Sequence, residues 1–293
     1  MRKFIQTQCL LLVSALIVCA ITLQTGCKNR SYSSPAGYDL GKPQKMELGK
    51  VLNEISGIAY DSDKKVILAI SDSKAKVFEI HVEKHKLKDL TDKIVEPDAD
   101  LEDLVKVGSS VFVLSSKGII YEVSVDKKDS SGVKSYPFWS HDQNDFETLY
   151  YDPGADGLVM MCKTCESDKG KKLRSAYRFD LASHTWDSSA YYTISTEDVK
   201  KLVKNVDAKF DPSAAAIHPL NKRLYILSSA GNLLVVTDTR GKVIEGYSLN
   251  PDEFPQAEGI AFAPNGDMYV SNEGKYGKPT LQIFTFHDSG KNK

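Results

Sequence analysis

The chain has 293 residues and a mass of 32.4 kDa, of which 41% are hydrophobic and 26% charged. These are the proportions of a globular protein, and they exclude a disordered chain and a fibrous repeat. The mean hydropathy of −0.31 excludes a protein with several membrane spans, and the formal charge of −1 argues against a nucleic-acid binder with a basic surface.

The first residues of the chain are typical of an export signal. Arg2 and Lys3 precede an apolar run from Cys9 to Leu23, which has the length of a secretory signal core and is too short for a membrane span. The run is followed by Gly26-Cys27 and a polar segment. This pattern resembles a bacterial lipoprotein signal, in which the cysteine receives the lipid, although Gln24 stands where an aliphatic residue is usual. An ordinary cleaved signal peptide is the alternative.

We therefore expect a lipoprotein signal peptide over residues 1–26, a tether over 27–43 and a single domain over 44–293. Lipidation of Cys27 would anchor the exported chain to a membrane of the bacterial cell envelope. Loss of Arg2 and Lys3 with the signal moves the formal charge from −1 to −3. Apart from Cys27, only Cys162 and Cys165 then remain, and such a pair in an exported protein predicts a disulfide more than a metal site.

A motif of two apolar runs around a turn recurs five times in the rest of the chain. In the last copy, QAEGIAFAPNGDMYVSNEG, the dipeptide Asn265-Gly266 indicates a tight hairpin. Aligning the copies places five residues in register, at separations of 46, 45, 66 and 45: Ser56, Glu102, Glu147, Ser213 and Glu258. A third apolar run follows every hairpin and a fourth follows four of them. This period predicts an all-β fold, a β-propeller of five four-stranded blades.

Two irregularities in the repeat carry further predictions. Blade five lacks a fourth strand, and the orphan segment Lys45–Leu48 is expected to supply it and so close the ring. The separation of 66 exceeds the usual 45 by 21 residues, and much of this insertion, residues 195–209, has the apolar spacing of a helix that begins at Ser195. A degenerate sixth blade within residues 166–210 is the alternative.

Polar residues begin each of the five innermost strands. Side chains two residues apart in a strand share a face, so each strand should direct a pair of them into the central channel. The pairs are Glu54/Ser56, Asp100/Glu102, Asp145/Glu147, Asp211/Ser213 and Gln256/Glu258. Seven carboxylates around one axis repel one another unless they are protonated or neutralised, and oxygen donors in such number suit Ca²⁺. We predict a calcium site in the channel, with Glu102, Glu147 and Glu258 as its main ligands. The alternative is that these acids accept hydrogen bonds from the backbone of neighbouring blades.

The loops that follow the second strands are expected at the same rim as the acids. They contribute the candidate ligand-binding residues Asp72, Lys163, Arg174 and Asn272, which could hold an anionic ligand next to a metal ion. Solvated loop lysines are the alternative. Cys162 and Cys165 lie at the mouth of the blade-three loop, where a redox centre is the alternative to a disulfide that stiffens the loop.

Several phrases in the five copies resemble one family. EISGIAYD, DLEDLV, DFETLYYD, PSAAAIHP and QAEGIAFAPNGDMYVSNEG are similar to the SdiA-regulated family of bacterial exported β-propellers, which is related to NHL-repeat and phytase-like propellers. The resemblance covers residues 45–287. It implies a propeller, export and calcium, but no defined activity.

Two functional hypotheses follow. The first is an envelope-anchored, monomeric binding module for a small-molecule or protein ligand, with no nucleic acid as a partner. The second is a metal-dependent hydrolase that resembles propeller phytases or lactonases, in which Ca²⁺ polarises an ester or phosphoester.

Overall fold

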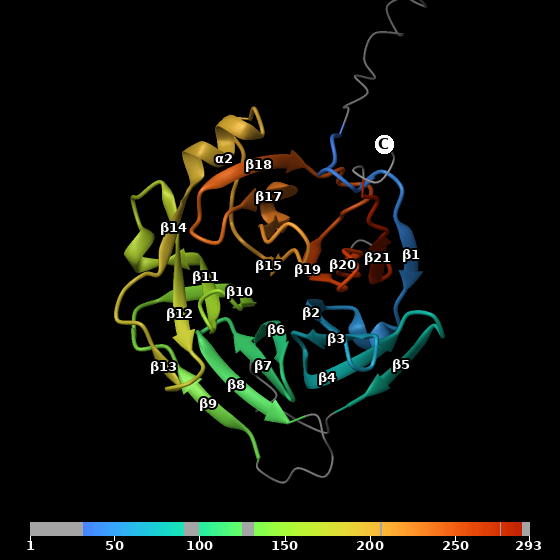
Figure 1. Cartoon of the computed structure of the whole chain (residues 1–293), viewed down its shortest axis with the longest axis horizontal. Coiled ribbons are helices and arrows are strands. Elements are labelled where there is room, and N and C mark those ends of the chain that lie inside the picture. Colours follow the sequence, from blue (N-terminus) through green and yellow to red (C-terminus); the bar gives the residue numbers. More distant parts are fainter. Residues whose placement is uncertain (1–31, 91–99, 125–131, 206, 276, 289–293) are drawn as a thin grey trace, which may run out of the picture. The chain divides into compact units, whose positions relative to one another are not determined.

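The computed structural model describes residues 32–90, 100–124, 132–205, 207–275 and 277–288. Within these ranges the chain forms five antiparallel sheets arranged as blades around one axis (Figure 1). The five-bladed propeller predicted from the repeat is confirmed. No helix within the described ranges is long and apolar enough to cross a membrane. The predicted signal peptide and Cys27 lie outside the described residues.

Each blade is built from the axis outward by consecutive strands. Blade one consists of β2 (Ile55–Asp61), β3 (Val66–Ser71), β4 (Lys74–His81) and β5 (Lys86–Asp89). Blade two consists of β6 (Leu101–Val107), β7 (Ser110–Ser115), β8 (Ile119–Ser124) and β9 (Lys134–Pro137). Blade three contains β10 (Asn144–Asp152), β11 (Gly157–Cys165), β12 (Leu173–Asp180), β13 (Thr185–Trp186) and β14 (Tyr192–Ser195).

Blade four consists of β15 (Ala214–Ile217), β16 (Leu224–Ser228), β17 (Leu233–Thr237) and β18 (Val243–Ser248). Blade five contains β19 (Ala257–Phe262), β20 (Met268–Asn272) and β21 (Thr280–Phe284). In every blade the hairpin between the first two strands turns through a residue with positive φ, as tight turns require. These residues are Lys65, Gly108, Asp156, Lys222 and Gly266.

The hydrophobic core lies between adjacent blades. Five clusters of buried apolar side chains each join the facing surfaces of two neighbouring sheets, including the pair formed by blade five and blade one. Every sheet therefore buries both of its faces. This explains why β3, β16 and β17 are almost continuous apolar runs and do not alternate with polar residues.

Strand β1 (Gln44–Glu47) completes blade five. It pairs antiparallel with β21, with Gln44 opposite Ile283 and Glu47 opposite Thr280, which confirms the predicted closure of the ring. Part of the segment expected to be a tether also packs on the propeller. Tyr38 and Leu40 are only 8% and 5% exposed, because their side chains fill the seam between blades four and five.

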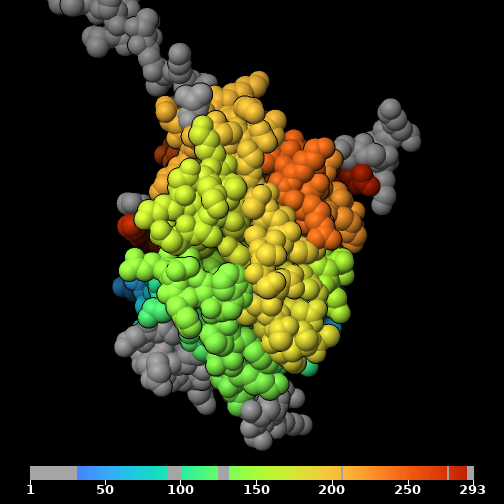
Figure 2. Space-filling view, turned by 90° about the vertical axis from the view of Figure 1, so that its left-hand side faces the viewer, coloured from blue at the N-terminus to red at the C-terminus, as the bar shows by residue number. Residues whose placement is uncertain are grey.

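The described residues of the insertion belong to blade three and form no sixth blade. Both β13 and β14 pair with the outer edge of β12. Helix α2 spans Thr196–Leu202, shorter than the predicted 195–209, and is followed by Lys204 with positive φ. It begins as predicted, with the backbone N–H of Asp198 donating to the Ser195 hydroxyl at 3.2 Å. Figure 2 shows this side of the propeller, where the yellow and gold insertion lies between green blades two and three and orange blade four.

Candidate functional site

The two ends of the propeller differ in chemistry because all five innermost strands run in the same direction. Each strand begins beside the loop that joins the second and third strands of its blade, and each ends at the hairpin to the second strand. We call the first end, where Glu102 and Glu258 lie, the acidic end. The opposite end, formed by the five hairpins, is called the hairpin end.

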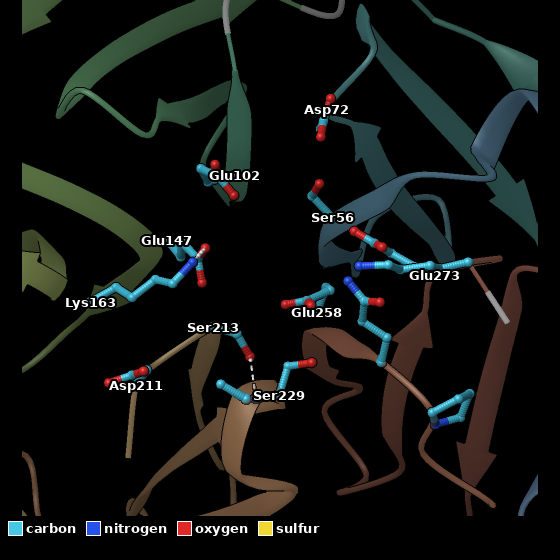
Figure 3. A pocket seen from close by; sticks show the side chains of 14 residues that line it. Ser56, Asp72, Glu102, Glu147, Lys163, Asp211, Ser213, Ser229, Glu258 and Glu273 are labelled. Carbon is cyan, nitrogen blue, oxygen red and sulfur yellow. Dashed lines mark hydrogen bonds and ion pairs between the residues drawn. The ribbon is translucent and has the colours of Figure 1, made fainter. Parts of the chain in front are cut away.

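A cavity of about 400 Å³ opens at the acidic end of the channel. The five residues that the repeat aligns all line it, one from each blade (Figure 3): Ser56, Glu102, Glu147, Ser213 and Glu258. In blades one, two, three and five the pairing register shifts at this residue. Such a β-bulge re-aims a side chain, and here it turns the aligned residue toward the axis.

The outer residues of the predicted pairs behave differently. Among these five, only Asp211 and Gln256 line the cavity. Glu54 and Asp100 are exposed to solvent, and Asp145 borders a neighbouring cavity beside the blade-three loop. Of the seven carboxylates expected to converge on the channel, Glu102, Glu147, Asp211 and Glu258 line the cavity. Glu54, Asp100 and Asp145 do not line it.

The carboxylates that do face the cavity have strongly perturbed pKa values. Burial, together with the charges of Glu147, Asp100 and Asp145, raises the pKa of Glu102 to about 9. Burial and the nearby charges of Glu147 and Glu273 raise the pKa of Glu258 to about 7. At neutral pH the cavity therefore holds Glu102 protonated and Glu258 partly protonated.

Two acids on loops add to this group. Burial and the charge of Asp72 raise the pKa of Glu273 to about 7, and burial also raises the pKa of Asp72. Asp72 was predicted as a ligand-binding residue and lines the cavity. Glu273 was not predicted, because it lies after the end of β20, where strand alternation no longer fixes the direction of a side chain.

Lys163 brings a positive charge into the cavity. Its ammonium group donates a hydrogen bond to Glu147 and lies 3.6 Å from Asp145 Oδ2. Burial alone would lower the pKa of Lys163, but Glu147 and Asp145 outweigh that effect and raise it. The register of β10 and β11 shifts at Lys163, and a disulfide between Cys162 and Cys165, with Cα atoms 5.9 Å apart, brackets this bulge. The bulge and the disulfide thus hold the lysine over the channel.

The other two predicted ligand-binding residues lie away from the channel cavity. Arg174 borders the cavity beside the blade-three loop, and its guanidinium donates to Asp211 Oδ1 at 2.6 Å. Burial would raise the pKa of Asp211, but its ion pairs with Lys209 and Arg174 lower it. Asn272 is fully buried and donates to Gln282 within blade five, so it holds the sheet together.

Asp103, the residue after Glu102, joins the backbones of blades two and three. Asp103 is 3% exposed, and its two oxygens accept hydrogen bonds at 2.8 Å from the backbone N–H groups of Leu104 and of Leu149 in blade three. Burial raises its pKa well above the ordinary value, against the lowering effect of these bonds. The role that we considered for the channel acids thus belongs to a residue that the repeat alignment did not select.

The cavity offers oxygen donors of the kind that bind metal ions. Carboxylate and hydroxyl oxygens dominate its wall, and these are the ligands that Ca²⁺ prefers. As they are placed, however, no three His, Cys, Asp or Glu side chains within the described ranges lie close enough together to hold one ion. Binding of a metal would therefore require the long glutamate side chains to turn toward one another.

Comparisons with known proteins agree with the fold. A family model described as SdiA-regulated matches residues 36–276. A luciferin-regenerating enzyme is 11% identical with a TM-score of 0.52, over 83% of this chain and 95% of its own. A PQQ-bound aldose sugar dehydrogenase from Streptomyces coelicolor is 12% identical with a TM-score of 0.51, over 87% and 100% of the two chains.

A putative gluconolactonase is 13% identical with a TM-score of 0.51, over 88% of each chain. Identities this low establish a shared architecture and no shared activity. No curated protein matches the chain.

Proposed function

The chain belongs to the SdiA-regulated family, and we propose that it is an envelope-anchored binding protein that takes a cationic ligand at the acidic end of its channel. The observation that carries this proposal is the convergence of Glu102, Glu147 and Glu258, from three different blades, on one cavity of about 400 Å³.

The electrostatics of the cavity support a cation. Removing a carboxylate from water disfavours its charged form, and nearby carboxylates add to this cost. The raised pKa values of Glu102, Glu258 and Glu273 express both effects. A bound cation favours the charged forms of these carboxylates and lowers their pKa values, so its binding is coupled to the release of their protons. Lys163 provides this compensation locally, for Glu147 and Asp145.

The spacing of the acids bears on the kind of cation. An organic cation with two ammonium groups can pair with separated carboxylates where they stand, whereas Ca²⁺ needs them to converge. Both kinds of cation bind through the attraction between their positive charge and carboxylate oxygens. Calcium and a diamine such as putrescine are therefore the two probes.

The proposal is tested by thermal unfolding of EDTA-treated protein with and without each cation. A ligand that binds only the folded state stabilises it by about 2.7 kcal/mol at a hundredfold excess over Kd. For a domain of this size that corresponds to a rise in Tm of roughly 5–11 °C. Binding should also strengthen between pH 6 and pH 8, because Glu258 and Glu273 lose their protons in this range.

A matched pair of variants locates the effect. Glu258→Gln removes a carboxylate of the cavity and should reduce the rise in Tm by at least half. Glu197→Gln removes an exposed carboxylate on α2, which pairs with Lys172 and Lys200, and should leave the rise unchanged. If neither cation raises Tm, or if both variants respond like the parent, the cavity is not a cation site.

A further inference from the structure

The hairpin end of the channel holds a second cavity, of about 380 Å³, with a different lining. The residues two positions after the aligned ones are Ile58, Leu104, Leu149, Ala215 and Ile260, and all five line it. The residues four positions after the aligned ones also line this cavity: Tyr60, Lys106, Tyr151, Ile217 and Phe262. Within this set the only charged side chain is Lys106, which pairs with Asp63 at 2.8 Å and Asp61 at 3.3 Å. This cavity is therefore apolar where the first is acidic.

The N-terminal segment enters the propeller at this same end. Gln44 of β1 lies opposite Ile283, near the end of β21, so β1 runs from the hairpin end toward the acidic end. Before β1, the Tyr38 hydroxyl donates to the carbonyl of Gly266 in the hairpin of blade five and lies 2.8 Å from His218 Nε2 in the hairpin of blade four. The chain is thus fixed to the hairpin end from Tyr38 onward.

The length of the segment before Tyr38 limits how far the hairpin end can lie from a membrane. Tyr38 follows Cys27 by 11 positions. A fully extended segment of that length spans at most about 40 Å, and a flexible one spans about 18 Å on average. A lipid on Cys27 would therefore keep the hairpin end close to the bilayer.

The hairpin end also carries the most exposed large hydrophobic side chain among the described residues. Leu220, in the hairpin of blade four, is 52% exposed. It lies in the sequence between Pro219 and Lys222, which both line the apolar cavity. A leucine beside a lysine suits a bilayer surface, because the leucine enters the acyl boundary while the ammonium group meets lipid phosphate.

We infer that the hairpin end is the membrane-facing surface of this protein, with Leu220 and the rim of the apolar cavity in contact with the lipid surface. This inference rests on the proposed anchoring through Cys27. The acidic end then faces away from the bilayer. Charge favours this orientation, because anionic lipids repel the carboxylates of the acidic end, whereas Asp61 and Asp63 at the hairpin end are paired with Lys106. It also leaves the proposed cation site open to the surrounding solution.

A pair of labelled variants tests the orientation. Ser73 lies in a loop at the acidic end and Ser109 in a hairpin at the opposite end, and both are exposed. Ser73→Cys and Ser109→Cys each introduce a reactive thiol, since Cys162 and Cys165 are joined to each other. The full lipidated protein is placed on vesicles of phosphatidylethanolamine and phosphatidylglycerol that contain a headgroup nitroxide lipid. Fluorophores at position 109 should be quenched several-fold more than those at position 73. Equal quenching, or stronger quenching at position 73, overturns the inference.

Leu220→Asp and Val51→Asp test the contact with the lipid surface. Cys27→Ala separates this contact from the lipid anchor. Leu220→Asp should reduce quenching of the label at position 109 by at least half, whereas Val51→Asp, an exposed apolar residue near the acidic end, should not. If the parent and Cys27→Ala both float equally with the vesicles, anchoring through Cys27 is refuted. If the parent floats and Cys27→Ala does not, yet the two labels are quenched equally, anchoring stands and the membrane-facing hairpin end is refuted.

Discussion

Replacing Glu102 by Gln should remove most of the alkaline instability that the channel carboxylates confer. Burial, with the charges of Glu147, Asp100 and Asp145, raises the pKa of Glu102 from 4.5 to about 9. The unfolded chain loses this proton near its ordinary pKa, while the folded protein keeps it. The stability contributed by the protonated group is therefore fully present below pH 4.5 and is lost as the pH rises toward about 9.

The size of the loss between pH 7 and pH 9 follows from these pKa values. Each unit of pH changes the free energy of unfolding by about 1.4 kcal/mol for every proton by which the two states differ. For Glu102 the loss amounts to about 2 kcal/mol, and Glu258 and Glu273, with pKa values of about 7, together add about 1 kcal/mol. The total of about 3 kcal/mol corresponds to a fall in Tm of about 6–12 °C for a domain of this size. Glu102→Gln should lose only about a third of that.

The measurement is thermal unfolding of parent and variant at pH 7, 8 and 9 and constant ionic strength. Groups other than Glu102 affect both proteins equally, so the difference between the two Tm values isolates Glu102. Glu197→Gln serves as the control, because this exposed acid on α2 should leave the slope of the parent unchanged. If Tm falls in parallel for the parent and Glu102→Gln, the channel carboxylates do not set the pH dependence and the reasoning is refuted.

The remaining predictions concern the contacts that hold the ring together. Deleting residues 28–49 removes β1 and the buried side chains of Tyr38, Leu40 and Met46, so calorimetry should show the whole propeller melting at a lower temperature. An unchanged Tm would contradict closure by β1. Asp103→Ala leaves the N–H groups of Leu104 and Leu149 without their acceptor and should reduce the free energy of unfolding in urea by about 2–5 kcal/mol. A loss below about 1 kcal/mol would show that these bonds do not stabilise the seam between blades two and three.

Much of the fold was predictable because its determinants are local and repeated. A hairpin needs only two apolar runs and a turn, and five copies, three of whose four separations are 45 or 46 residues, indicate a propeller. The closing strand was predictable for a topological reason, since blade five had an open edge and the segment before blade one had no partner. The buried positions of Tyr38 and Leu40 were missed because nothing repeats there.

The candidate site was predictable only in part, because its geometry depends on bulges and on contacts between blades. The aligned positions identified Glu102, Glu147 and Glu258 correctly as residues of the channel. Strand alternation did not place Glu54 and Asp100, because both precede the first residue of their strands, where alternation does not fix the direction of a side chain. Asp103 was missed because its partner, the N–H group of Leu149, lies 46 residues away.

The innermost strands also explain why an acidic cavity and an apolar one can share a single channel. Each aligned position occurs once in every blade, so the five residues at that position form a ring around the axis. Two residues, about 7 Å along the strand, separate the ring of Glu102 and Glu258 from the ring of Leu104 and Ile260. The latter side chains are 2% and 3% exposed, so they form an apolar floor beneath the carboxylates. Such a floor lowers the local dielectric constant and strengthens the attraction between the carboxylates and a cation. We therefore expect a charged ligand of the proposed site to enter and leave from the acidic end.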